Sequence, residues 1–137
     1  MFERCVYFNA NTLARKLSAR WEESFKKYGL SPAHGYLIRL ILEEPGVSQQ
    51  YIGETLVLDK STVTRFINKL EKSGWVSREP SEKDQREKII NPTDKAQQIH
   101  QDLRSLGDEL YSSMKQLLGK DELEVFVKTL RAFSLKL

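Results

Sequence analysis

Residues 59–74 constrain the fold of this chain most, because they contain both boundaries of a helix and two chemically different faces. Asp59 is a typical N-cap residue, whose carboxylate accepts hydrogen bonds from the free amides of the first turn. Gly74 is a typical stop, because glycine takes the left-handed conformation after a helix without steric cost. Apolar residues between them recur at the i, i+3, i+4, i+7 spacing of a buried helical stripe, namely Val63, Phe66, Ile67 and Leu70.

The opposite face of the predicted helix carries hydroxyl, amide and cationic groups, concentrated in its N-terminal half: Lys60, Ser61, Thr64, Arg65 and Asn68. This is the end that a recognition helix inserts into the major groove of DNA. An amphipathic helix with a polar outer face is also the commonest helix in globular proteins. The helix alone therefore leaves both interpretations open.

The preceding segment, residues 46–58, predicts a shorter helix. Ser48 is a candidate N-cap after the Pro45-Gly46 break, and apolar residues follow it on one side. Gly53 is unusual inside a helix, where glycine costs about 1 kcal/mol relative to alanine. A close helix crossing explains it, because a missing Cβ lets two backbones approach. With a tight turn at Val57-Leu58, the two helices predict a helix-turn-helix.

The following segment predicts a β-hairpin. Two β-prone runs, residues 75–80 and 87–91, flank a charged polar loop. Pro80 stands where the first strand should end, because proline cannot donate a hydrogen bond to a neighbouring strand. A hairpin directly after a recognition helix is a wing, and the combination is more specific than any of its parts.

Two runs, DKSTVTR at 59–65 and LEKSGWVSR at 70–78, resemble the MarR family of bacterial transcriptional regulators. The resemblance covers essentially the whole chain and is strongest in residues 46–96. Asp84 and Arg86 match the wing motif of that family, and Thr93 matches the threonine that opens its next helix. Gln85 departs from the pattern, because the family often has two consecutive arginines in the wing.

A second departure lies at residues 92–96, where PTDKA replaces the Leu-Thr-x-x-Gly signature of the family. We expect it to alter the turn between strand and helix without changing the function. In the wing, Arg86 is the candidate for insertion into the minor groove. The alternative is structural, with the Asp84 carboxylate holding the shape of the hairpin.

The resemblance implies a mainly α fold with a small β-hairpin wing, in which winged helix-turn-helix subunits form an obligate homodimer. Such dimers bind pseudo-palindromic promoter DNA, usually as repressors, and small aromatic or phenolic effectors commonly release them. The two recognition helices of a dimer lie about 34–36 Å apart, one turn of B-DNA.

Amphipathic segments at both ends of the chain agree with a dimer. An apolar stripe runs from about Asn9 to Tyr28, and another from Thr93 predicts one long helix before Gly119, with a slight bend at Gly107. A third stripe begins at Leu123. A small winged domain has no room to bury all three, so we expect residues 1–30 and 93–137 to form the dimerisation base. Residues 31–92 then form the DNA-binding lobe, with a buried connecting helix over about 31–44.

The predicted DNA contacts are Lys60, Ser61, Thr62, Thr64, Arg65, Asn68, Lys69 and Arg86. Arg65 suits a bidentate contact with guanine or a clamp on a phosphate. Ser61 and Thr64 are short donors for base edges or phosphates. Lys60 and Lys69 are phosphate contacts or solvated charges. Thr62 is ambiguous, because it also suits contact with the neighbouring helix.

Effector-binding residues are less well defined. The resemblance places a small-molecule cleft between the dimer base and the winged lobe, with candidate lining residues Trp21, Tyr28, His34 and Tyr36. Each of them also suits plain core or surface. Cys5 lies close to the position of the reactive cysteine in the hydroperoxide-sensing branch of the family, so a thiol-based repressor is an alternative. An inert, exposed thiol is the other interpretation.

Composition agrees with this view without establishing it. A net charge of +3 and a pI of about 9.0 are too mildly basic to suggest a nucleic-acid partner alone. The chain has no apolar run of membrane-spanning length and no signal peptide after Met1, so we expect a cytoplasmic protein. We expect no cofactor and no metal, and no catalytic arrangement indicates an enzyme. A winged-helix interaction module that no longer binds DNA remains the third alternative.

Overall fold

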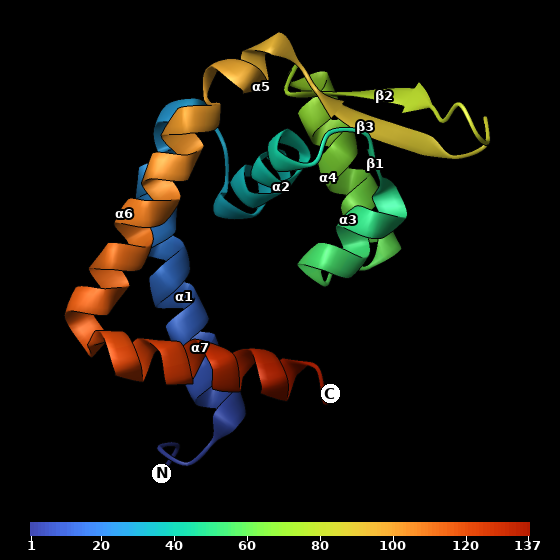
Figure 1. Ribbon diagram of the computed structural model, residues 1–137. Helices are drawn as coiled ribbons and strands as arrows, with labels where there is room; N and C mark the ends of the chain where they lie inside the picture. The colour runs from blue at the N-terminus through green and yellow to red at the C-terminus, as the bar shows by residue number, and fades with distance from the viewer. The chain divides into compact units, whose positions relative to one another are not determined.

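The computed structural model describes residues 1–137 and is mainly helical, with one small antiparallel sheet (Figure 1). Two compact units divide the chain, Met1–Leu103 and Arg104–Leu137. The elements in order are α1 (Val6–Phe25), η1 (Lys26–Tyr28), α2 (Pro32–Glu43), β1 (Val47–Ser48), α3 (Gln49–Leu56), α4 (Lys60–Lys72), β2 (Val76–Pro80), β3 (Lys88–Pro92), α5 (Asp94–Gln98), α6 (His100–Leu118) and α7 (Lys120–Ser134).

Helix α4 forms as its sequence predicts. The Asp59 carboxylate accepts a hydrogen bond from the Thr62 amide at 2.7 Å, which caps the first turn. The helix ends before Gly74, which takes a φ of +82°, the left-handed region that favours glycine. Three of the four predicted apolar residues are fully buried, Val63, Ile67 and Leu70, and Phe66 is half-buried. These residues dock α4 on the lobe and leave its polar face outside.

Helix α3 and the turn after it complete the helix-turn-helix. The Ser48 hydroxyl accepts from the Tyr51 amide at 3.1 Å and caps α3. The turn places Val57 in the left-handed region, with a φ of +56°. A Cβ at Gly53 would lie 3.0 Å from the carbonyl oxygen of Leu58 and 3.4 Å from Val63 Cγ2. The predicted close approach is confirmed, and the nearest atom belongs to the turn.

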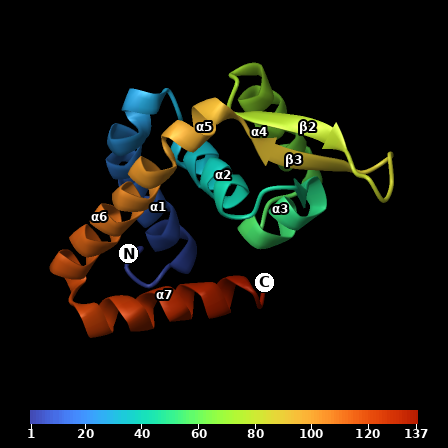
Figure 2. The same ribbon diagram turned by 45° about the horizontal axis from the view of Figure 1, so that its top comes forward.

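Strands β2 and β3 form the predicted wing, paired antiparallel from Val76 opposite Pro92 to Pro80 opposite Lys88. The hairpin and its loop extend from the body of the lobe in both views (Figures 1 and 2). β1 adds a third strand on the other side of β3, with Val47 opposite Ile90. β1 was not predicted, because a strand of two residues is too short to show an alternating pattern.

Helix α2 is largely buried, as predicted. The Ser31 hydroxyl caps it by accepting from the His34 amide at 3.2 Å. It packs against α1, α3, α5 and β3, and Figure 2 shows it between α1 and α3. Its inward face holds the largest share of the core: Leu37, Ile38, Ile41 and Leu42.

Two expected helices differ from the structure. The first begins at Val6 rather than near Asn9, and its last turn tightens into η1, which ends at Gly29 with a φ of +67°. The single long helix expected from Thr93 is wrong, because it is interrupted at Ile99 (φ −102°, ψ 5°) between α5 and α6. The Ile99 amide bonds the carbonyl of Ala96, three residues back, so the turn tightens there. Gly107 lies inside α6 and causes no break.

The second unit contains most of α6 and all of α7, separated by Gly119 at a φ of +91°. Leu123 is buried, whereas many apolar side chains of α7 and the chain end are exposed: Val125, Phe126, Val127, Leu130, Phe133, Leu135 and Leu137. At the start of the first unit, Phe2, Val6, Tyr7 and Phe8 are also exposed. None of the helices combines the length and apolar character needed to cross a membrane.

Candidate nucleic-acid interface

The polar face of α4 is open to solvent. A shallow hollow of about 550 Å³ lies on it, lined by Lys60, Ser61, Thr64, Arg65 and Asn68. Lys69 is exposed as well, whereas Thr62 is half-buried. The structure thus gathers five of the eight predicted DNA contacts around one depression, and all five carry hydrogen-bonding groups.

Asp59 organises the start of this face. Its Oδ1 accepts from the Ser61 hydroxyl at 2.8 Å and from the Thr62 amide at 2.7 Å. The amide of Thr62 and the hydroxyl of Ser61 lower the pKa of Asp59 below its usual value of 3.8. Asp59 is therefore ionised at neutral pH, and its carboxylate acts only as an acceptor.

Gln49, the first residue of α3, contacts the same face. Its Nε2 donates to the Thr64 hydroxyl at 3.3 Å. A second hollow, of about 390 Å³, lies between α3 and α4, and its lining includes Gln49, Gln50 and Lys60. Gln49 was not among the predicted contacts, because its partner lies fifteen residues away in sequence and on another helix.

Arg78 of β2 ties the wing to α4. Its guanidinium forms an ion pair with Glu71 at 2.9 Å (Nη2 to Oε1), and Nη2 also donates to Asn68 Oδ1. The guanidinium lowers the pKa of the Glu71 carboxyl. Arg78 was not among the predicted site residues, because an arginine in a strand shows no local sign of which helix it contacts.

The tip of the wing is shaped by Asp84. The Arg86 amide donates to its Oδ1 at 3.0 Å, and the Glu87 amide donates to its carbonyl oxygen at 3.0 Å. These bonds support the structural interpretation of Asp84. The Arg86 and Gln85 side chains are exposed at the tip, so the minor-groove role of Arg86 stays a prediction.

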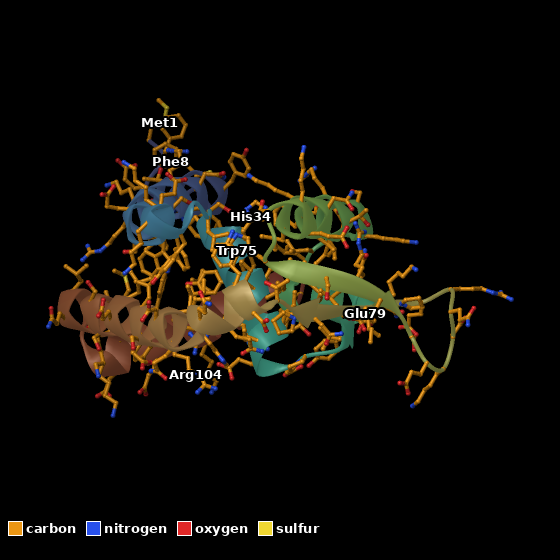
Figure 3. All side chains as sticks on the ribbon, turned by 90° about the horizontal axis from the view of Figure 1, so that it is seen from above. Met1, Phe8, His34, Trp75, Glu79 and Arg104 are labelled. Atoms are coloured by element: carbon orange, nitrogen blue, oxygen red, sulfur yellow. The ribbon has the colours of Figure 1, made fainter.

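The four candidate effector residues lie in three places. Trp21 Nε1 donates to the Tyr36 hydroxyl at 2.7 Å, so these two residues are together. The Tyr28 hydroxyl instead donates to Asp102 at 3.3 Å. His34 belongs to α2 (labelled in Figure 3), and its ring faces α4, with its centroid 4.5 Å from that of Phe66. The role of these residues in binding an effector stays a prediction.

His34 has an unusual environment for a titratable group. Its side chain is buried, its Nδ1 is 2.6 Å from the Ser31 hydroxyl, and its Nε2 has no hydrogen-bond partner. Burial lowers the pKa of His34 below 6.5, and the charges of Lys69 and Arg65 on α4 lower it further. The ring is therefore neutral at pH 7.

Cys5 is exposed and caps α1, with its Sγ accepting from the Phe8 amide at 3.4 Å. Asn9 closes the same turn by donating to the Cys5 carbonyl oxygen at 2.8 Å. This capping role is one structural reason for the cysteine. The structure contains no group of three or more histidine, cysteine, aspartate or glutamate residues that could hold a metal ion.

Comparison with known proteins identifies the family. The MarR family model matches residues 30–88. The HTH-type transcriptional regulator MgrA of Staphylococcus aureus is 32% identical over 100 residues, which are 73% of this chain and 67% of the relative. YybA of Bacillus subtilis strain 168, an uncharacterised HTH-type transcriptional regulator, is 33% identical over 97 residues, covering 70% and 64%.

Solved structures share the fold at lower identity. A MarR protein from Peptoclostridium difficile superposes with a TM-score of 0.85 at 23% identity, covering 98% of this chain and 88% of that one. MepR of S. aureus, solved as a DNA complex, gives a TM-score of 0.87 at 18% identity, with 98% and 100% covered. Fold, motifs and sequence identity agree, and this protein belongs to the MarR family of transcriptional regulators.

Proposed function

We propose that this protein is a homodimeric regulator that binds pseudo-palindromic promoter DNA through α4, acts as a repressor, and is released by a small-molecule effector. The observation that carries the proposal is the open polar face of α4, where five hydrogen-bonding side chains surround one hollow. Most side chains on this face are exposed, whereas three of the four apolar residues on the opposite face are fully buried. An exposed cluster of this chemistry suits the edges of bases and the phosphates beside them.

Two structural neighbours support a duplex DNA partner. MepR was solved as a DNA complex, and the repressor CouR was solved bound to a 23-mer DNA duplex. CouR matches with a TM-score of 0.86 at 20% identity, covering 97% of this chain and 94% of that one. Each of these proteins shares the fold of this chain, and our proposal assigns the contact with DNA to α4.

Within this proposal the side chains divide by chemistry. Arg65 contacts a guanine or clamps a phosphate, and Ser61, Thr64 and Asn68 face base edges. Lys60 and Lys69 contact phosphates, and Thr62 supports the first turn. Arg86 at the tip of the wing contacts the minor groove, which attracts arginine where it is narrow.

The dimer is proposed from the exposed apolar side chains at both ends of the chain. Phe126, Leu130 and Phe133 of α7 are between 39% and 45% exposed, and Tyr7 is 80% exposed. Large exposed apolar patches usually mark interfaces. We therefore assign residues 1–30 and 93–137 to a two-fold dimerisation base, and residues 31–92 to the DNA-binding lobe.

Release by an aromatic or phenolic effector is proposed for the residues around the Trp21–Tyr36 pair, with Tyr28 and His34 as further candidates. The expected result is that such a compound weakens DNA binding by the native chain and not by Trp21→Ala. A thiol-based alternative is supported by the exposure of Cys5. If it holds, peroxide releases the native protein from DNA and does not release Cys5→Ser.

Fluorescence anisotropy tests DNA binding most directly. The purified protein is titrated against labelled duplex DNA from upstream of its own coding sequence, at two salt concentrations. Arg65→Ala is the test variant, and Arg39→Ala, which removes the same charge from α2 of the same lobe, is the matched control. We expect tight, salt-sensitive binding that Arg65→Ala weakens by about 1–3 kcal/mol and Arg39→Ala leaves nearly unchanged.

The salt dependence separates the two roles of Arg65. Loss of a phosphate contact reduces the slope of log K against log salt by about 1, whereas loss of a base contact weakens binding mainly on the preferred sequence. Weak binding that is equal for all three proteins on every DNA tested would contradict the proposal. It would instead favour a winged-helix module that binds a protein partner.

A further inference from the structure

Three of the residues that line the hollow on α4 are already hydrogen-bonded to side chains outside its polar face. Ser61 bonds Asp59, Thr64 bonds Gln49, and Asn68 bonds Arg78. Hydroxyl and amide groups can both donate and accept. A hydroxyl has one proton and two lone pairs, so an intramolecular bond that uses the proton leaves only lone pairs for a ligand, whereas one that uses a lone pair leaves the proton available.

Ser61 is left as an acceptor. Its hydroxyl has one proton, and that proton is donated to Asp59 Oδ1 at 2.8 Å. The carboxylate cannot donate, because the bonds that it accepts keep it ionised. The outward side of the Ser61 oxygen thus presents lone pairs.

Asn68 is left as a donor. Arginine has five N–H groups and no acceptor, so only the amide oxygen of Asn68 can face Arg78. The ion pair between Arg78 and Glu71 holds the guanidinium in place. The Asn68 Nδ2 group, with its two hydrogens, then remains available to a ligand. An asparagine with its oxygen engaged is poorly suited to the usual bidentate contact with adenine, which needs both amide atoms.

Thr64 is also left as a donor. Its oxygen accepts from Gln49 Nε2 at 3.3 Å, so its own proton is available to a ligand. Arg65, between these residues in sequence and exposed, can only donate.

We infer that Asp59, Gln49 and Arg78 are positioning residues that preset the polar face of α4, with an acceptor at Ser61 and donors at Thr64, Arg65 and Asn68. This inference rests on the proposed function. Donors match N7 and O6 of guanine, N7 of adenine and O4 of thymine, and the acceptor matches N4 of cytosine or N6 of adenine. The base preference of this protein therefore depends on residues of α3 and β2 that need not touch DNA.

Selection from duplex DNA with randomised positions tests the inference, using the full-length chain and two matched pairs of variants. Gln49→Glu replaces the donor to Thr64 with a carboxylate, which forces the Thr64 hydroxyl to donate inward and present lone pairs. Gln50→Glu adds the same charge at the next, exposed position, where the side chain bonds Glu54 instead. Arg78→Gln releases the Asn68 amide, and Lys72→Gln removes the same charge from the end of α4.

The expected result is a change of preferred base at one position in each half-site for Gln49→Glu and for Arg78→Gln. Competition binding should show the ratio of affinities for the two bases changing by about three- to tenfold, the range of one hydrogen bond. The controls should weaken binding to all sequences equally and leave the ratio unchanged. Thermal melting confirms that each variant is folded.

Identical preferences within each matched pair would overturn the inference while leaving the proposed function intact. If Arg78→Gln does not fold, the comparison of Gln49→Glu with Gln50→Glu tests the inference alone. Both residues lie in the first turn of α3, and of the two only Gln49 contacts Thr64. If the native chain selects no DNA sequence, the proposed function and this inference are both overturned. This outcome is visible with the native protein alone, so it is distinguishable from a failure of the inference.

Discussion

The contact between Gly35 of α2 and Phe25 of α1 gives a quantitative test of how these two helices pack together. A Cβ at Gly35 would lie 2.2 Å from Cε1 and 2.6 Å from Cδ1 of the Phe25 ring. Carbon atoms in contact are normally about 3.5–4.0 Å apart, so the added methyl overlaps the ring by more than 1 Å. Phe25 is only 4% exposed, so its ring is enclosed by the core.

Gly35→Ala therefore sets two effects against each other. Alanine favours the helix by about 1 kcal/mol relative to glycine, whereas inserting a methyl group into a packed core costs about 1–3 kcal/mol. Because the overlap is large and involves a buried ring, we expect a cost at the upper end, about 2–3 kcal/mol. After the gain in helix propensity, the free energy of unfolding should fall by about 1–2 kcal/mol. Urea unfolding at one fixed protein concentration measures this change, since the stability of a dimer depends on concentration.

A double-mutant cycle supplies the control. Phe25→Leu alone leaves a cavity and should cost about 1–2 kcal/mol. In the double variant the alanine methyl occupies part of that cavity, so the two losses should fall short of their sum by about 1 kcal/mol. If Gly35→Ala instead raises stability, or if the two losses simply add, the ring does not hold the position that the structure gives it.

Three further changes test local features. Burial and the charges of Lys69 and Arg65 lower the pKa of His34 below 6.5, so the folded state binds fewer protons than the unfolded state. The stability linked to His34 is complete above pH 6.5 and is lost as the pH falls toward the lowered pKa. Urea unfolding between about pH 5 and 7 should therefore show that the free energy of unfolding depends less on pH in His34→Gln than in the native protein. Gly74→Ala should lower stability by about 1–2 kcal/mol, because φ is +82° there, and Gly74→Asn should lose less. Thr93→Val removes the hydroxyl that donates to the Gly74 carbonyl oxygen at 2.6 Å and caps α5, at a cost of about 1 kcal/mol in thermal unfolding, and Thr93→Ser should retain most of it.

Features whose partners lie within one helical turn were predictable from the sequence. The predicted caps at Ser48 and Asp59 each accept from the amide three residues later, and the structure contains both bonds. The hairpin and its end at Pro80 were predictable for a similar reason, since proline limits a strand by its own geometry. Such signals depend only on the local chain.

Features that depend on another element were not predictable. The apolar period continues through Ile99, so the break between α5 and α6 left no trace in the pattern. Gly35 shows no local sign that the Phe25 ring lies against it. β1 is too short to have a period, and it forms because β3 offers it a partner.

The candidate site contains both kinds of feature, those that the local sequence predicts and those that depend on another element. The residue types on the outer face of α4 follow from its helical period, which is why Ser61, Thr64 and Asn68 could be named in advance. Their hydrogen-bonding direction depends on side chains from α3 and β2 that no period connects to α4. Two relatives with the same residues on the recognition helix but different residues at positions 49 and 78 would then present different donors and acceptors. On the proposed mode of recognition, operator preference cannot be transferred between family members by matching the recognition helix alone, and the residues that hold its side chains must match as well.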